Sequence, residues 1–111
     1  MLFLNLHYYK DSYYSVPPEK IPEISAASYA FIDKYLKSGK CQDRYWFADG
    51  SGGIAIWDFE SPEEANAILR ESVVFPYLKS QLIPLIDYKG LTKMRAQAET
   101  AQKAASRASK K

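Results

Sequence analysis

The only histidine in this chain of 111 residues is His7, which lies in an alternating segment near the N-terminus. The ordinary pKa of imidazole is close to neutrality, so a neutral histidine can accept a proton from a carbon beside a carbonyl group. The alternative is a structural histidine, buried or at a rim, whose ring is hydrogen-bonded by Asn5 or by a backbone group. We place His7 in the candidate catalytic set as a general base.

Arg44 is the second candidate catalytic residue, because a guanidinium can hold a carboxylate or stabilise the oxyanion that develops as a proton leaves. The alternative is an exposed strand arginine that pairs with Asp43 or Asp49.

Aromatic residues make up 14% of the chain, a high share for this length. Such side chains line protein cores, subunit interfaces and pockets for flat ligands, and composition alone does not choose among these. The candidate ligand-binding residues near the two catalytic candidates are Asn5, Tyr9, Trp46 and Trp57. The alternative role for the aromatic members is packing at an interface.

Other chemistries find little support in the residues present. Cys41 is the single cysteine, so an intramolecular disulfide and a thiolate metal site are both excluded. One histidine makes a transition-metal site improbable, although axial ligation of haem needs only one. The glycines of residues 50–53 lead into a strand rather than a helix, which argues against a phosphate loop. We expect no metal and no cofactor.

The length and composition indicate one small globular domain. A chain of 111 residues is too short for a two-domain enzyme. Hydrophobic residues make up 47% and charged residues 25%, which is ordinary for a folded protein and excludes a wholly disordered chain. The N-terminal segment turns polar too early for a signal peptide, and no apolar run approaches the ~20 residues that span a bilayer. We expect a cytoplasmic protein.

The charge is unevenly distributed along the chain. Residues 92–111 contain six basic residues and Glu99 alone, a net charge of +5, so the formal +2 of the whole chain leaves −3 on the rest. A mildly acidic body is not typical of a nucleic-acid-binding protein, and we expect neither nucleic acid nor membrane as a partner. The sequence therefore predicts a domain over residues 1–91 and a basic extension over 92–111, helical or frayed.

The pattern of apolar residues predicts six elements in the body. Strands are expected over residues 2–9, 41–48, 54–59 and 79–88, and helices over 19–37 and 61–72. Ser61 and Glu64 have the spacing of a capping box, and Gly39 suits the end of the first helix. The order β-α-β-β-α-β indicates an α+β fold with a ferredoxin-like antiparallel sheet.

One face of such a sheet is covered by helices, and a dimer is expected to cover the other. We expect Leu2, Leu4, Leu6, Ile54 and Ile56 to face the helices. The opposite set is expected to face the interior of a two-subunit barrel: Phe3, Asn5, His7, Tyr9, Gln42, Arg44, Trp46, Ala55, Trp57 and Phe59.

Several short motifs resemble the muconolactone delta-isomerase family. They are Gly39-Lys40, the stretch Ile-Trp-Asp-Phe-Glu-Ser at 56–61, Phe-Pro-Tyr at 75–77 and Pro-Leu at 84–85. The similarity runs without a gap from Gly39 to Leu85, covers most of residues 1–88 and includes none of the tail. The family's Trp-Arg pair falls on Tyr45-Trp46, so the nearest arginine is Arg44. Three histidines of the family fall on Asp43, Asn66 and Tyr88.

The resemblance implies a dimeric α+β barrel and a small cytoplasmic enzyme without a cofactor. It also implies the shift of a double bond in an unsaturated lactone during the breakdown of aromatic compounds, in a homodimer or larger homo-oligomer. We therefore expect an isomerase that moves a proton on an unsaturated lactone or related carbonyl compound. Because this fold serves several functions, a monooxygenase-like protein and a non-catalytic small-molecule-binding or structural dimer remain alternatives.

Overall fold

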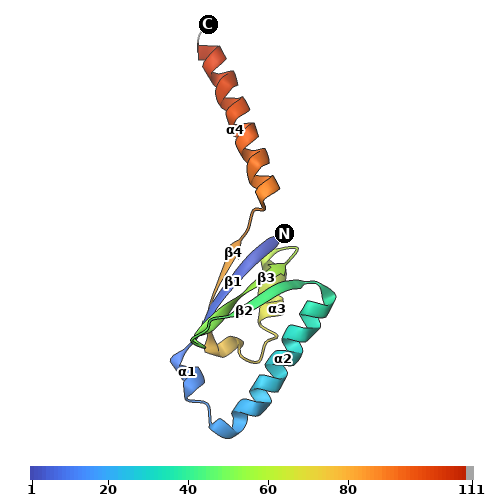
Figure 1. Ribbon diagram of the computed structural model, residues 1–111, viewed down its shortest axis with the longest axis vertical. Helices are drawn as coiled ribbons and strands as arrows, with labels where there is room; N and C mark the ends of the chain where they lie inside the picture. Colours follow the sequence, from blue (N-terminus) through green and yellow to red (C-terminus); the bar gives the residue numbers. More distant parts are fainter. Residues whose placement is uncertain (110–111) are drawn as a thin grey trace.

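The computed structural model describes residues 1–109, with side chains as far as residue 107. A four-stranded sheet carries two helices on one face, and a further long helix extends away from this body (Figure 1). The elements in chain order are β1 (Leu2–Tyr9), α1 (Asp11–Tyr14), η1 (Pro18–Lys20), α2 (Ile21–Ser38), β2 (Cys41–Trp46), β3 (Gly52–Asp58), α3 (Pro62–Leu69), η2 (Phe75–Tyr77), β4 (Leu78–Pro84) and α4 (Tyr88–Ser109).

The strand order is β2-β3-β1-β4, and every neighbouring pair is antiparallel. This arrangement confirms the α+β, ferredoxin-like prediction. The strand expected over 79–88 spans Leu78–Pro84 instead. It lies at the edge of the sheet, where a proline is tolerated because an edge strand does not need every N–H group for pairing. The next element begins at Tyr88, which is helical rather than extended.

Local sequence signals explain the ends of the two body helices. Gly39 has a φ of 79°, the left-handed conformation that ends a helix without steric cost when no side chain is present. Ser61 caps α3, and its hydroxyl accepts a hydrogen bond from the Glu64 backbone at 3.1 Å. The Glu64 carboxylate pairs with Lys40 rather than completing the capping box. The expected helix over 61–72 therefore begins as predicted but ends at Leu69.

The hydrophobic core lies between the sheet and the helices, and it consists largely of aromatic rings. Trp57 and Phe59 stack with their ring centroids 5.0 Å apart, and Tyr35 of α2 meets Trp57 at 5.6 Å. Phe3 of β1 is 1% exposed and belongs to the same cluster as the fully buried Ala65 of α3. The side chains of this face are thus the ones that meet α2 and α3.

This core contradicts the predicted assignment of the two sheet faces. The aromatic and polar set was expected to look away from the helices, and most of it lies beneath them. The reason is that both faces of the sheet are apolar, so alternation separates the two sets without showing which set the helices cover. The rings of Phe3, Trp57 and Phe59 pack against the helices. The leucines of β1 and the isoleucines of β3 therefore lie on the opposite face. Gln42 is the exception in the buried set, because a bulge in β2 leaves it exposed and brings Cys41 into the core instead.

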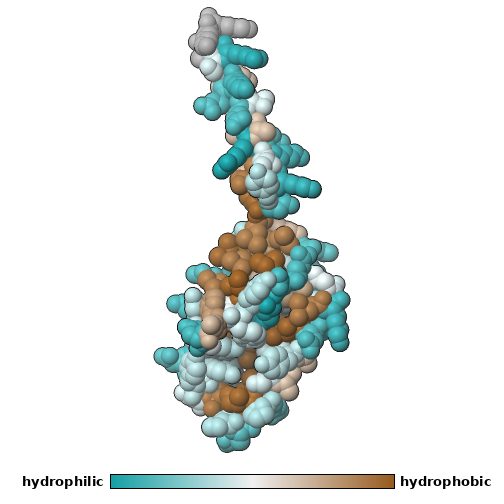
Figure 2. Space-filling model, in the orientation of Figure 1, coloured by the Kyte–Doolittle hydropathy of each residue, from teal (hydrophilic) through white to brown (hydrophobic). Residues whose placement is uncertain are grey.

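The uncovered face of the sheet carries mostly aliphatic and aromatic side chains, with the polar Lys79 and Gln81 on β4. The strand registers place Leu4 opposite Ile56 and Leu6 opposite Ile54, with Tyr45 beside Ile54 on the next strand. Tyr45 is 56% exposed and Ile83 of β4 is 41% exposed. Figure 2 shows that apolar residues gather over the part of the body from which α4 emerges. We call this aliphatic side the open face.

Helix α4 projects from the body, and the molecule extends 76 Å along its longest axis (Figure 1). Every side chain described from Leu91 to Arg107 is exposed. Hydrophilic residues dominate its surface in Figure 2. None of the helices in the described part of the chain has an apolar stretch that would cross a bilayer.

Removal of residues 92–111 is expected to leave the body folded. The segment packs against no core, so its loss should change the melting temperature by less than about 2 °C. Differential scanning calorimetry of the full and truncated chains measures this change. A larger loss, or a change of oligomeric state in light scattering, would show that the helix packs against a neighbouring subunit.

Candidate functional site

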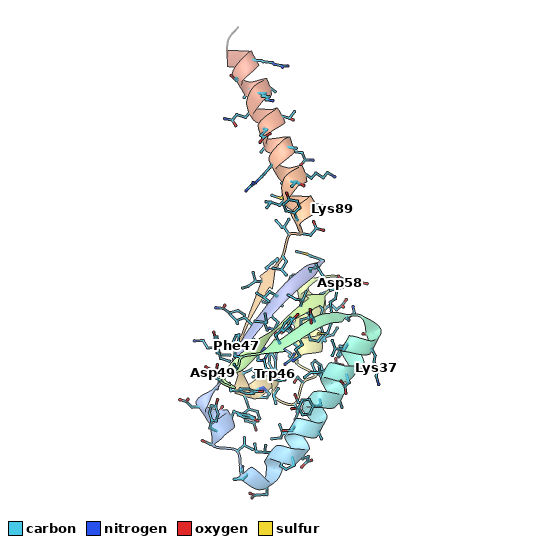
Figure 3. The ribbon with its side chains drawn as sticks, in the orientation of Figure 1. Lys37, Trp46, Phe47, Asp49, Asp58 and Lys89 are labelled. Carbon is cyan, nitrogen blue, oxygen red and sulfur yellow. The ribbon has the colours of Figure 1, made fainter. Side chains whose placement is uncertain are left out.

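A small cavity of ≈ 40 Å³ lies between one end of the sheet and the first half of α2. Figure 3 shows Trp46 at this end of the sheet, close to α1 and far from Asp58. The aromatic rings of β1, β2, α1 and α2 make up much of the wall. The lining residues are Tyr9, Tyr13, Ile24, Ser25, Ser28, Tyr29, Trp46 and Val74.

His7 lies next to this cavity, on the helix-covered face of the central strand. Its side chain is 1% exposed, and its ring meets those of Tyr9 and Trp46 edge-on at 6.5 and 6.1 Å. Neither ring nitrogen has a hydrogen-bond partner among the described residues. Asn5, the partner expected for a structural histidine, donates to the Gln81 carbonyl at 3.1 Å instead. Both nitrogens of a buried imidazole are therefore left unbonded.

The surroundings keep His7 neutral. Burial, together with the nearby positive charge of Arg44, lowers its pKa from 6.5 to about 4. Both causes disfavour the charged form, because imidazolium loses its hydration and is repelled by the guanidinium. At neutral pH the ring can accept a proton or form hydrogen bonds as an uncharged group.

Arg44 lies on β2 with its guanidinium over the Trp46 ring, 4.8 Å from the ring centroid. Its Nε is buried without a partner, and no carboxylate of residues 1–109 forms a salt bridge with it. The predicted alternative partners are engaged elsewhere. Asp43 accepts a hydrogen bond from Tyr45, and Asp49 accepts one from Ser51. Burial lowers the pKa of Arg44, but a guanidinium has such a high ordinary pKa that it stays charged at neutral pH.

The other candidate residues divide between the cavity and the core. Tyr9 and Trp46 line the cavity, and burial is the main cause that raises the pKa of the Tyr9 hydroxyl. Trp57 lies in the aromatic core and does not line the cavity. Asn5 is buried beside β4. The structure thus brings together His7, Tyr9, Arg44 and Trp46, although on the face opposite to the expected one.

Sequence reasoning missed the contribution of the helices to this cavity. Ser25 and Ser28 lie one turn apart on α2 and provide hydroxyl groups, while Tyr13 comes from the short helix α1. Ser28 shares the apolar face of the predicted first helix, and a serine at such a position is a signal that this face lines a polar space. Among the described residues, no three His, Cys, Asp or Glu side chains gather to hold a metal ion.

The burial of His7 makes the folded state sensitive to acid. The unfolded chain binds a proton to this imidazole near its ordinary pKa of 6.5, whereas the folded chain does so only near 4. The stabilising effect is therefore complete above pH 6.5 and is lost as the pH falls towards 4. Between pH 7 and pH 5 we expect the free energy of unfolding to fall by about 2 kcal/mol from this group.

Urea unfolding of the wild type and His7→Gln at both pH values measures this effect. The variant lacks the titrating group, so its stability should change less between pH 7 and pH 5. Equal pH dependence in the two proteins would contradict the lowered pKa.

Three comparisons with known proteins point to the same family. The family model of muconolactone delta-isomerase matches residues 1–90. The Muconolactone Delta-isomerase of Acinetobacter baylyi is 27% identical over 71 residues, which are 64% of this chain and 74% of that protein. The crystal structure of a muconolactone isomerase has a TM-score of 0.69 at 20% identity, and the match covers 79% of this chain and 91% of that chain. This structural likeness shows the shared fold. Because the family match spans the whole of the sheet and its helices, the chain belongs to the muconolactone delta-isomerase family.

Proposed function

We propose that this protein is an isomerase that shifts a double bond in an unsaturated lactone or related carbonyl compound by proton transfer. The observation that carries the proposal is the neutral, unbonded imidazole of His7 beside the unpaired guanidinium of Arg44. Proton abstraction next to a carbonyl needs a base and a group that stabilises the resulting oxyanion. These two residues supply the pair, and family membership supports the reaction class.

In the proposed reaction, the imidazole of His7 accepts the proton from the carbon beside the carbonyl group. The electron pair of the broken C–H bond moves into the conjugated system, and negative charge gathers on the carbonyl oxygen. Arg44 stabilises this oxygen. The imidazolium then returns the proton to a different carbon of the conjugated system, so the double bond moves while atoms and charge balance without a cofactor.

The low pKa of His7 affects both proton transfers. It makes the imidazole a weak base, and the electrostatic stabilisation of the enolate by Arg44 must offset this weakness. It also makes the imidazolium a strong acid, because the neighbouring guanidinium repels its charge. A stronger acid returns the proton more readily to the substrate carbon.

The proposed roles predict the kinetics of variants on muconolactone. Loss of the base in His7→Gln should lower kcat by roughly 10²–10⁴-fold. The wild-type rate should be flat through neutral pH and fall in acid with a midpoint at about 4, since protonation removes the base. Gln42→Ala, at an exposed position of the same strand as Arg44, is the control and should retain the wild-type rate.

Turnover rates over a range of pH for the three proteins decide the matter. Equal rates in wild type and His7→Gln would remove His7 from the mechanism. No turnover of muconolactone or related unsaturated lactones by the wild type would contradict the isomerase proposal and favour the non-catalytic binding protein.

We further propose that two copies pair through the open face to form a homodimer. In the monomer this face exposes large apolar side chains on three strands: Tyr8 of β1, Tyr45 of β2 and Ile83 of β4. Exposed apolar side chains that lie together on one face are typical of a surface that another subunit covers. A two-fold axis would place the same aliphatic side chains of two sheets against each other. This arrangement is the two-subunit barrel that family membership implies.

A charge on the open face should break the homodimer. Leu6→Glu introduces a carboxylate opposite Ile54, where a dimer would bury it without a partner at a cost of several kcal/mol. Light scattering should show a dimer or larger assembly for the wild type and a smaller species for this variant. Leu36→Glu, on the outer side of α2, is the control. A wild-type monomer of 12.6 kDa at micromolar concentration would contradict the pairing.

A further inference from the structure

One wall of the cavity is formed by two stacked tyrosine rings. Tyr13 of α1 stacks on Tyr9 with ring centroids 4.5 Å apart and an interplanar angle of 26°. Both residues line the cavity. This near-parallel geometry is the one that two aromatic rings adopt when offset stacking is favourable. The face of Tyr9 is therefore a platform on which a flat ring is stable.

The helix that carries Tyr13 is weakly anchored. Helix α1 has four residues, none of them buried, and no side chain caps its N-terminus. The Tyr13 ring has two further aromatic neighbours, Tyr14 and Tyr77, with centroids 5.6 and 6.1 Å away. A short helix with so few buried contacts can open locally at small free-energy cost. Tyr13 can thus leave the platform without disturbing the sheet.

The positive charge of Arg44, near the cavity, favours a negatively charged ligand. None of the lining residues is charged, and the guanidinium of Arg44 lies over the ring of Trp46, which is one of them. Its positive charge also reaches Tyr9, since it opposes the rise in the pKa of that hydroxyl. A partly buried cation whose Nε has no partner is unfavourable, and an anionic ligand would neutralise it. The unbonded nitrogens of His7 and the hydroxyls of Ser25 and Ser28 add hydrogen-bonding capacity.

We propose that this cavity binds a planar aromatic anion, whose ring replaces Tyr13 on the face of Tyr9 and whose anionic group is drawn to Arg44. The inference rests on the proposed function for the location of the site, but it requires no turnover. It adds a ligand class, aromatic carboxylates, to the unsaturated lactones named above. The volume of ≈ 40 Å³ has room for water and not for a benzene ring, so binding requires the displacement of Tyr13.

Calorimetric titration with 4-hydroxybenzoate tests the ligand class. Two matched probes separate its features: cyclohexanecarboxylate has the charge without the aromatic ring, and 4-hydroxybenzamide has the ring without the charge. We expect 4-hydroxybenzoate to bind more tightly than cyclohexanecarboxylate by about 3–10-fold, because of stacking. We expect it to bind more tightly than the amide by about 10–100-fold, because of the charge-assisted contact.

Variants test the two contacts separately. Arg44→Gln should weaken binding of 4-hydroxybenzoate by about 10–100-fold and leave binding of the amide unchanged. Tyr13→Ala should tighten binding by about 3–10-fold, because the ligand no longer has to displace the internal ring. Tyr14→Ala removes a neighbouring exposed ring of the same helix and should change the affinity by less than about 2-fold. Circular dichroism checks that each variant is folded.

The outcomes separate this inference from the proposed function. No binding of 4-hydroxybenzoate up to about 10 mM, equal binding of cyclohexanecarboxylate, or weaker binding by folded Tyr13→Ala would overturn the ligand proposal. If the binding pattern is found and no lactone is turned over, the ligand proposal holds and the isomerase proposal fails. If lactones are turned over and aromatic carboxylates do not bind, the reverse is true.

Discussion

The backbone of β3 passes its two neighbours at Gly52 and Gly53 too closely for any side chain. A Cβ on Gly52 would lie 2.0 Å from the His7 carbonyl oxygen, and one on Gly53 would lie 2.3 Å from that of Tyr45. Gly53 pairs with His7 on one side and with Trp46 on the other. Because no side chain stands between them, the imidazole and the indole meet above the sheet. The site depends on this close approach.

The site contains a positive charge, that of Arg44, without a negative charge paired to it among the described residues. The buried His7 and the partly buried Arg44 both contact the Trp46 ring, and neither has an acidic partner in the described part of the chain. A structural pair would have been completed by a carboxylate, since burial of an unpaired cation costs free energy. Two other cations of the molecule, at partly exposed positions, do have carboxylate partners: Lys40 pairs with Glu64, and the N-terminal amine pairs with Asp58. The exception, Arg44, is the reason why we propose that the cavity takes an external anion or a developing negative charge.

The two faces of the sheet have different surroundings in one chain. The aromatic face builds the core with α2 and α3 and, at one end, the cavity. The aliphatic face has no cover within one chain, so its burial needs another surface. Neither face is covered by α4, whose described side chains beyond Gly90 are exposed. The family match likewise ends at residue 90.

The sequence by itself determined the element types and their order, because short-range signals are strong in this chain. Alternation marked the strands, Gly39 and Ser61 marked helix ends, and the β-α-β-β-α-β order left one common antiparallel topology. It also sorted the residues of β1 and β3 correctly into two sets, since a period of two is a local property of extended backbone. On β2 the sorting failed at Gln42, because a bulge in this strand shifts the alternation. Alternation placed His7 and Tyr9 on one face of the first strand. Arg44 and Trp46 joined this group because Trp46 was expected to be buried.

Only the tertiary structure decided which set the helices cover. Both sets are apolar enough to be buried, and the choice depends on whether side chains from distant elements, such as Tyr35 and Trp57, fill the space between helix and sheet. The cavity also lay beyond sequence reasoning. Its wall joins β1 and β2 to α1 and α2, and its empty volume results from packing between elements rather than from any local pattern.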